Sequence, residues 1–576
     1  MKKGSNGSNN FENGENKTPT VAVGIDNFES IRQRNTFYID KTNFIKEWWE
    51  QGDQVTLITR PRRFGKTLNM SMVEYFFSNQ YAGRGDLFEG LSIWEEEYYR
   101  NIQGSYPTIF ISFAGVKERN YKDTCYRIKE QIGLLYRKNK DILKDDMFDE
   151  CDREYYNGIS AQMSDVTAAT ALQRLCDFLS RYYGKKVLIL MDEYDTPMQE
   201  AYVNGFWDEM TGFIRNLFNN TFKTNPYMER VLMTGITRVS KESVFSDFNN
   251  PQIVSTTTNM YTTSFGFTEQ EVFDSLDIHG LGEKKQAVKS WYDGFTFGKT
   301  TDIYNPWSII CFLREGELKP YWANTSSNSL VGQLVQQGEP ELKKSMEDLL
   351  EEKTLRTEID EQIIFEQLNG SVNAVWSLLL ASGYLKIVSL EQKKNGEFIY
   401  ELALTNREVN FMFQKMIQGW FSENKSAYND FVKAFLIGDK KAMNRFMNRI
   451  AISMFSYFDT GKNPSEYAEP EKFYHGFVLG LMVELRDRYV ITSNRESGFG
   501  RYDVMLQPLE KKDVAIIIEF KVHEPEDESD MQETVAAALH QIEEKNYDAD
   551  LINRGIKKEN IRHYGFAFQG KTVLIG

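Results

Sequence analysis

The sequence predicts an α/β protein made of several domains. The chain has 576 residues, and at roughly 150 residues per domain it is long enough for three or four of them. Hydrophobic residues make up 41% and aromatic residues 14% of the chain, so apolar side chains suffice for packed cores. Continuous apolar runs alternate with helical patterns, which is typical of buried strands in α/β sheets: Thr56–Thr59, Tyr106–Ala114, Val187–Met191, Val231–Ile236 and Val514–Val522.

Composition narrows the classes of protein further. No apolar run approaches the roughly 20 residues needed to cross a bilayer, and the N-terminus has no apolar signal-peptide core. The cysteines are scattered, which argues against a disulfide framework and a structural zinc site: Cys125, Cys151, Cys176 and Cys311. We therefore expect a cytoplasmic protein without a membrane partner. The formal net charge of −15 means that any nucleic acid must bind a local basic patch.

A phosphate-binding loop is predicted between the first apolar run and the helical pattern that follows it. The segment TLITRPRRFGKT ends in Gly65-Lys66-Thr67, and strand, tight loop and helix are the context that such a loop requires. Backbone N–H groups and the helix N-terminus would cradle a triphosphate. Lys66 would reach the β- and γ-phosphates, and Thr67 would bind Mg²⁺. The expected contacts to ATP are Arg62, Arg63, Phe64, Gly65, Lys66, Thr67 and Leu68.

This loop departs from the usual pattern at its first position. A glycine normally stands five residues before the second glycine, and Arg60 occupies that position here. Arg60 adopts positive φ less easily than glycine, so we expect altered geometry, with Pro61 fixing its own φ. Arg62 and Arg63 either contact phosphates or pair with surface carboxylates, and the sequence leaves both alternatives open.

A second nucleotide motif is predicted at Val187–Glu193. Five apolar residues lead into Asp192-Glu193, as in a Walker B strand, whose C-terminal end is where α/β sheets bind ligands. Asp192 would hold Mg²⁺, and Glu193 would activate the attacking water as a general base. A core strand running into a helix N-terminus would also explain the acids. The two motifs together, in this order, favour a nucleotide hydrolase.

The strand predicted at Val231–Ile236 is followed by Thr237 and Arg238. In additional-strand NTPases the strand beside Walker B ends in a polar residue that senses the γ-phosphate. Thr237 or Arg238 would have this role, and an arginine there contributes a factor of about 10³–10⁵ in rate. A capping or ion-pairing role for Arg238 explains the residue equally well.

The rest of the sequence divides into further segments. Phe37–Ile39 is a strand candidate, and Thr268 with Glu271 forms a capping box. The dense aromatic residues of Trp291–Gly298 and Tyr304–Ser308 indicate a small core. The predicted domains are a disordered tail at 1–20, an ATPase core at 21–250, an accessory lid or winged-helix-like region at 251–330, a helical connector at 331–465 and a nuclease-like domain at 466–576.

A metal-dependent site is predicted in the last of these domains. Glu519 and Lys521 lie two apart in the strand VAIIIEFKV and so share one face, and Asp503 lies in the preceding strand. Two carboxylates would bind Mg²⁺, which lowers the pKa of a bound water, and the lysine would orient that water. A structural Glu–Lys pair at a sheet edge is the alternative. Gln541 on the following helix is placed to contact the site.

These motifs together resemble a known family. RPRRFGKT, LILMDEYD, WYDGF with YNPWS, and SNRESGFGRYD followed by IIIEFK are similar to bacterial AAA-ATPase-like proteins with a C-terminal PD-(D/E)XK nuclease-superfamily domain. The resemblance runs from about Val21 to the C-terminus. It implies a P-loop NTPase of the additional-strand type with a small helical or winged-helix-like region, and a restriction-endonuclease-like α/β domain. It maps the nuclease motif onto Asp503, Glu519 and Lys521, with Glu484 or His475 as weaker candidates.

The leading hypothesis is an ATP-dependent, Mg²⁺-dependent nuclease, with DNA favoured over RNA as the substrate. A nucleotide-switched signalling or scaffold protein, whose terminal domain only binds, is an alternative of a different class. A third is an ATPase motor in which the nuclease fold is incidental. A homo-oligomer is compatible with each hypothesis, because many such ATPases receive an arginine from a neighbouring subunit.

Overall fold

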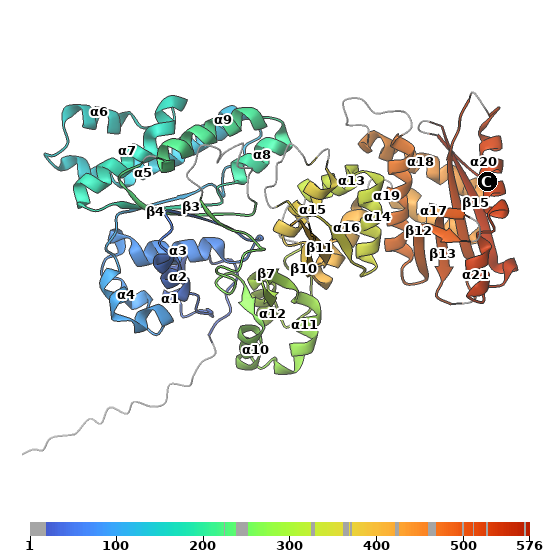
Figure 1. Ribbon diagram of the computed structural model, residues 1–576, viewed down its shortest axis with the longest axis horizontal. Helices are drawn as coiled ribbons and strands as arrows, with labels where there is room; N and C mark the ends of the chain where they lie inside the picture. Colours follow the sequence, from blue (N-terminus) through green and yellow to red (C-terminus); the bar gives the residue numbers. More distant parts are fainter. Residues whose placement is uncertain are drawn as a thin grey trace, which may run out of the picture. The chain divides into compact units, whose positions relative to one another are not determined.

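The computed structural model divides the chain into two compact units, Met1–Trp322 and Ala323–Gly576, described separately below (Figure 1). The structure describes residues 19–223, 225–237, 251–323, 329–360, 368, 371–394, 396–420, 425–458, 468–497, 500–510, 512–525, 528–569 and 572–576. Most of the predicted N-terminal tail and Arg238 therefore lie outside the described residues.

The first unit is built on a five-stranded parallel sheet with strand order β2-β3-β4-β1-β5. All of the apolar runs predicted as strands in this unit belong to it. Strand β4 lies between β1 and β3, so it separates the strand before the phosphate-binding loop from the strand that ends in Asp192. The strands are β1 (Val55–Thr59), β2 (Thr108–Ser112), β3 (Val187–Asp192), β4 (Met228–Gly235) and β5 (Gln252–Val254).

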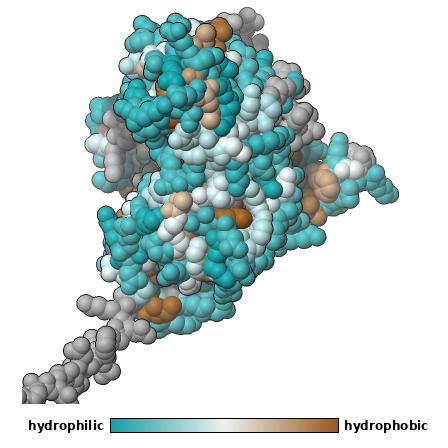
Figure 2. All heavy atoms as spheres, turned by 90° about the vertical axis from the view of Figure 1, so that its left-hand side faces the viewer, coloured by the Kyte–Doolittle hydropathy of each residue, from teal (hydrophilic) through white to brown (hydrophobic). Residues whose placement is uncertain are grey.

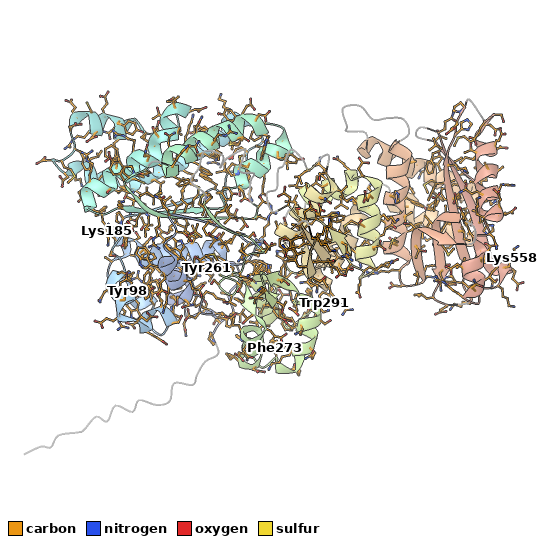
Figure 3. All side chains as sticks on the ribbon, in the orientation of Figure 1. Tyr98, Lys185, Tyr261, Phe273, Trp291 and Lys558 are labelled. Carbon is orange, nitrogen blue, oxygen red and sulfur yellow. The ribbon has the colours of Figure 1, made fainter. Side chains whose placement is uncertain are left out.

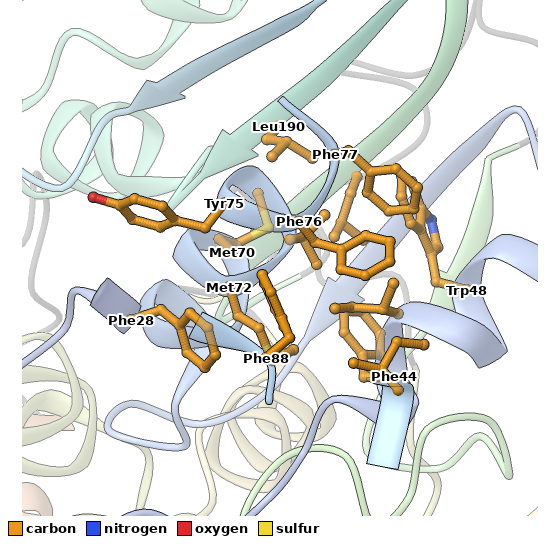
Figure 4. Close-up of a cluster of buried hydrophobic side chains, with 14 of the residues drawn as sticks. Phe28, Phe44, Trp48, Met70, Met72, Tyr75, Phe76, Phe77, Phe88 and Leu190 are labelled. Carbon is orange, nitrogen blue, oxygen red and sulfur yellow. The ribbon is translucent and has the colours of Figure 1, made fainter. Parts of the chain in front are cut away.

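Helices cover both faces of this sheet (Figure 1). One face carries α1 (Phe28–Gln33), α2 (Asn43–Gln51), α3 (Lys66–Phe77) and α4 (Glu97–Ile102). The other carries α5 (Tyr121–Lys138), α6 (Glu150–Gly158), α7 (Asp165–Tyr183), α8 (Thr196–Asn204) and α9 (Trp207–Phe218). Aromatic side chains from α1, α2 and α3 form a core against the sheet, where Phe76 contacts Phe77 and Phe88 (Figure 4). This core fixes the position of α3 and hence of the loop before it.

The segment predicted as a strand at Phe37–Ile39 is not one. A single bridge joins Thr20 to Thr36, and the residues after it run without a ladder to the start of α2. The side chain of Tyr38 packs against the core beside the sheet, and the side chain of Phe37 packs against a separate core formed by residues 267–313. A short aromatic segment that packs into two cores has the same apolar pattern as a buried strand, although it pairs with no neighbouring strand among the described residues.

Residues 251–322 include β5 and then form a lobe with its own core, which we call the accessory lobe. A three-stranded sheet of order β6-β8-β7 packs with three helices. The capping box predicted at Thr268 and Glu271 is confirmed at the start of α10. The elements are β6 (Phe267–Thr268), α10 (Glu269–Ile278), α11 (Lys285–Tyr292), β7 (Phe295–Phe297), β8 (Thr300–Tyr304) and α12 (Pro306–Glu315).

The second unit begins with a region that combines helices with short strands. It contains an antiparallel sheet of order β10-β11-β9. In chain order this region runs helix, strand, helix and hairpin. Its elements are α14 (Pro340–Leu350), β9 (Leu355–Thr357), α15 (Val372–Ala381), β10 (Leu385–Gln392) and β11 (Phe398–Leu404). The helices around it are α13 (Ser329–Gln337), α16 (Arg407–Trp420), α17 (Lys425–Ile437) and α18 (Lys440–Phe458).

The C-terminal domain is a mixed five-stranded sheet with strand order β12-β13-β14-β15-β16. Strands β14 and β15 are parallel, and the other neighbours are antiparallel. Helices α17, α18 and α19 pack together, α19 beside β12, while α20 packs on β14 and β15. The elements are α19 (Ala468–Leu485), β12 (Tyr489–Ser497), β13 (Gly500–Pro508), β14 (Ala515–Val522), α20 (Met531–Glu544), α21 (Asp548–Asn553), β15 (Ile561–Gln569) and β16 (Thr572–Ile575).

Among the described residues, none of the helices is both long and apolar enough to cross a bilayer. On the face of the molecule drawn in Figure 2, apolar side chains appear as small separate patches within a polar surface.

Candidate functional site

The phosphate-binding loop joins β1 to α3 and has a compact conformation. Gly65 has a φ of 80°, a left-handed value that glycine adopts without strain, and α3 begins at the next residue. The buried amine of Lys66 donates hydrogen bonds to the carbonyls of Arg60 (3.0 Å) and Pro61 (2.9 Å). The loop thus closes around the Lys66 side chain, and the first N–H groups of α3 remain available for an anion.

Arg60 does not distort the loop as the sequence predicts. Its φ is not positive, since the positive values in this loop belong to Arg63 and Gly65. The Arg60 side chain is fully buried, donates to the carbonyls of Ser255 (2.6 Å) and Met260 (3.2 Å), and stacks on Phe297. The residue in the usual glycine position therefore ties the loop to the accessory lobe.

The accessory lobe also contacts Arg62, Arg63 and Phe64 of the loop. The carbonyl of Arg62 accepts hydrogen bonds from Asn305 Nδ2 (3.2 Å) and Trp322 Nε1 (3.1 Å). Phe64 packs against Phe295 and Phe297, and the Arg63 guanidinium lies 4.3 Å from the centre of the Trp307 ring. Because the C=O and N–H of a trans peptide point in opposite directions, the Arg63 N–H faces away from Asn305 and Trp322.

The two predicted nucleotide motifs meet at Asp192. Thr67 Oγ1 donates to Asp192 Oδ2 (2.9 Å), although 125 residues separate them. Thr234 Oγ1 on β4 donates to the other carboxylate oxygen (2.6 Å). Burial, then the charge of Glu193, raises the pKa of Asp192, whereas burial lowers the pKa of Lys66. A hydroxyl, a carboxylate and an ammonium group at one edge of a parallel sheet are suited to hold Mg²⁺ and phosphate.

Glu193 follows Asp192 in a strained conformation, with a φ of 49°. Its N–H lies 3.4 Å from Thr234 Oγ1, and its carboxylate accepts a hydrogen bond from Thr196. Positive φ in a glutamate costs free energy, and such strain clusters at functional sites. It turns Glu193 out of the β3 ladder, at the end of the strand where Asp192 lies.

Two residues of this site were missed by sequence reasoning. Thr234 contacts both acids of the Walker B motif, and its only sequence signal is a polar residue within the apolar run VLMTGI. Asp195 is buried and its Oδ2 accepts hydrogen bonds from Thr237 N and Thr237 Oγ1, both 2.9 Å. Thr237, a predicted γ-phosphate sensor, is thus bonded to Asp195, and Thr234 occupies the position between the motifs.

A second site lies in the C-terminal domain, where β13 meets β14. The register pairs Val504 with Ile518, so the next pair places Asp503 opposite Glu519. Asp503 Oδ2 accepts a hydrogen bond from the N–H of Phe520 (2.7 Å), and Gln541 of α20 donates to Glu519 Oε1. Lys521 shares the face of Glu519. The structure therefore brings together the predicted residues, including Gln541.

The electrostatics of Glu519 suit a metal ligand. Its side chain is 3% exposed, and its buried Oε2 atom has no hydrogen-bond partner among the described residues. Burial, together with the negative charge of Asp503, raises the pKa of Glu519 to about 8. A buried glutamate that is repelled by a neighbouring aspartate is stabilised by a divalent cation, and Mg²⁺ prefers such oxygen ligands. The residues present therefore fit a divalent ion.

The weaker candidates lie elsewhere. His475 of α19 is buried 3.8 Å from Glu347 of α14, which also accepts a hydrogen bond from Ser493. Glu484 is exposed on α19. A third acidic cluster, in the accessory lobe, surrounds Lys289, which already supplies a positive charge.

The first unit has the fold and paired motifs of a P-loop ATPase, and the C-terminal sheet carries the acid and lysine pattern of a nuclease fold. Residues 22–245 match the family model described as "Predicted AAA-ATPase", and residues 469–576 match that of the PD-(D/E)XK nuclease superfamily. The chain therefore combines an AAA-ATPase-like domain with a C-terminal PD-(D/E)XK nuclease-superfamily domain. It is also similar to an uncharacterized protein in the vnfD 5′ region of Azotobacter chroococcum mcd 1, with 27% identity over 403 residues and 68% of each chain covered.

Proposed function

We propose that this protein binds and hydrolyses ATP and cleaves phosphodiester bonds in nucleic acid, with DNA favoured, in a Mg²⁺-dependent reaction. The observation that carries the proposal is the buried Glu519 opposite the half-buried Asp503 and beside Lys521, since a cation would compensate the Glu519 oxygen that has no hydrogen-bond partner among the described residues. A domain that only bound nucleic acid would not need a buried glutamate opposite an aspartate whose charge repels it.

In the nucleotide site, Lys66 would contact the β- and γ-phosphates, and Thr67 and Asp192 would hold Mg²⁺. Glu193 would accept the proton of the attacking water. Thr234 orients both acids through its hydroxyl group and would respond to the γ-phosphate more directly than Thr237. The position of β4 between β1 and β3 supports assignment to the additional-strand class.

In the nuclease site, Asp503 and Glu519 would hold the metal, and bound Mg²⁺ would lower the pKa of a water and neutralise charge on the phosphodiester. Lys521 would orient that water. Gln541 fixes the Glu519 carboxylate through Oε1 and leaves Oε2 for a ligand. Metal binding requires Glu519 to lose its proton, so the raised pKa of this residue ties occupancy to pH.

Plasmid degradation tests the proposal. We expect the wild type to degrade DNA with Mg²⁺, Lys521→Ala to lose this activity, and Lys66→Ala to lose its dependence on ATP. Lys512→Ala, which removes an exposed lysine beyond the other end of β14, is the matched control. Equal cleavage by wild type and Lys521→Ala would refute the nuclease assignment.

A nucleotide-switched scaffold is the second candidate function. The winged-helix order of β9, α15, β10 and β11 favours it, because that arrangement occurs in binding modules. Calorimetric titration with Mg²⁺ separates the candidates: a nuclease site gives heat that Asp503→Ala abolishes, whereas a scaffold gives the same trace for both proteins.

A further inference from the structure

Helix α18 has an unusual charge for this protein. The chain has a formal net charge of −15, yet α18 contains no Asp or Glu. It contains four cationic residues, Lys440, Lys441, Arg445 and Arg449. By contrast, α20 of the same unit carries three glutamates and neither lysine nor arginine. The described part of the second unit therefore presents a concentrated positive charge on α18.

Three of these cations form one exposed stripe, which we call the basic stripe. Lys441, Arg445 and Arg449 are all exposed and follow one another at intervals of four residues, so they lie on one face of the helix. None of them forms an ion pair with any of the described residues, and Arg445 contacts the ring of Phe446. The nearby acid Asp439 caps the helix by accepting the N–H of Ala442.

The basic stripe lies level with the nuclease site along the sheet. Asn448 of α18 exchanges hydrogen bonds with the backbone of Val573, and Asn444 does the same with Ile575. The residue between them, Leu574, pairs with Ala567, which pairs with Lys521. At about 4.8 Å per strand, β16 lies roughly 10 Å from β14, and α18 lies beside it.

The orientation of α18 turns the basic stripe away from the helices behind the sheet. Met443, Met447 and Ile450 are buried in the layer of α17 and α19. At about 100° per residue, the stripe lies on the opposite side of the helix from these apolar residues. Lys521 and Glu519 also point away from that layer, because Gln541 of α20 contacts Glu519, whereas their neighbour Phe520 packs on Phe566 beside Phe477 of α19.

We propose that the basic stripe binds the phosphate backbone of duplex DNA and positions it across the edge of the sheet toward Lys521. A duplex carries about one charge per 1.7 Å of axis, so the roughly 10 Å between β16 and β14 corresponds to about six phosphates. The stripe supplies the local positive surface that an acidic protein needs for such a partner. This inference rests on the proposed nuclease function.

Fluorescence anisotropy with a labelled DNA duplex tests the proposal, using the full chain without divalent metal so that no cleavage occurs. The test variant is Lys441→Gln/Arg445→Gln/Arg449→Gln. The matched control is Lys512→Gln/Lys557→Gln/Lys558→Gln, which removes the same charge. These exposed lysines lie near the N-terminal ends of β14 and β15, whereas Lys521 lies near the C-terminal end of β14; Figure 3 labels Lys558. All six positions are exposed, so both variants are expected to fold, and thermal unfolding checks this.

Each phosphate contact contributes about −0.9 to the slope of log K against log salt. We expect the stripe variant to lose close to three contacts, reducing the slope by about 2.7, while the control keeps the wild-type slope. Equal slopes in the two variants, or tighter wild-type binding to an RNA duplex than to DNA, would overturn the proposal. A wild type that binds DNA through other surfaces leaves the nuclease assignment intact, whereas a wild type that neither binds nor cleaves removes both.

Discussion

The indole N–H of Trp322 donates a hydrogen bond to the phosphate-binding loop, and a Phe substitution removes that hydrogen bond while keeping an aromatic ring. Without the indole N–H, the Arg62 carbonyl loses one of its two anchors and the loop loses order. A neutral hydrogen bond contributes about 0.5–1.5 kcal/mol, so we expect Trp322→Phe to bind MgATP roughly two- to tenfold more weakly by calorimetry. Trp48→Phe is the control, because it removes an equally buried indole hydrogen bond that contacts Thr56 instead. Equal affinities of the two variants would contradict a role for Trp322 in the loop.

Glu519 makes the stability of the metal-free protein depend on pH. Its pKa is raised to about 8 in the folded state by burial and by Asp503, and is near 4.5 when unperturbed. The folded state therefore binds an extra proton between these values, and the free energy of unfolding falls as pH rises through this window. We expect the melting temperature of the wild type to fall relative to Glu519→Gln between about pH 5 and 8, and Mg²⁺ to reverse the fall. Parallel curves for the two proteins would exclude the raised pKa.

At the scale of elements, α18 protects the edge of the C-terminal sheet. Strand β16 is the last in the sheet, and Asn444 and Asn448 satisfy backbone groups that would otherwise be open to another chain. We expect Asn444→Ala/Asn448→Ala to lose about 1–3 kcal/mol of stability and to self-associate, as measured by denaturant unfolding and light scattering. Asn204→Ala is the control, since that side chain bonds only within its own helix. A monomeric double variant of wild-type stability would refute the protective role.

The elements that could be predicted from the sequence are those with a local signal. The apolar runs before Thr67 and at Asp192 gave the strands, and Thr268 with Glu271 gave a helix start, because each pattern is complete within a few residues. Glu519 and Lys521 were recognisable because two charges stand in a buried strand. Contacts between distant segments had no such signal.

The misses share that cause. The hydrogen bond from Trp322 to Arg62 joins residues 260 positions apart, and no local sequence pattern predicts it. Thr234 has no distinctive sequence signal, and its contact with Asp192 depends on β4 lying between β1 and β3. Strands β9, β10 and β11 had no distinct sequence signal, because they lie between charged helical segments.

At the scale of the whole molecule, the chain consists of two compact units, and each contains one of the two candidate sites. Lys66, Thr67 and Asp192 lie in the first unit, and Asp503 and Glu519 lie in the second. A ligand that binds only the folded form of one unit stabilises that unit by about 2.7 kcal/mol at a hundred times its Kd. Because each unit has its own cores, we expect scanning calorimetry to resolve two unfolding transitions.

The two ligands should then move different transitions. A non-hydrolysable ATP analogue with Mg²⁺ should raise the midpoint of the first unit's transition in the wild type. Lys66→Ala should abolish that rise, because Lys66 is the predicted phosphate contact, and this identifies the transition of the first unit. With Mg²⁺ alone, the transition that Asp503→Ala leaves unshifted belongs to the second. If the analogue also raises the second transition in Asp503→Ala, the nucleotide site is energetically coupled to the nuclease unit, as ATP control of cleavage requires. A single transition that both ligands shift in every variant would contradict separate units with separate sites.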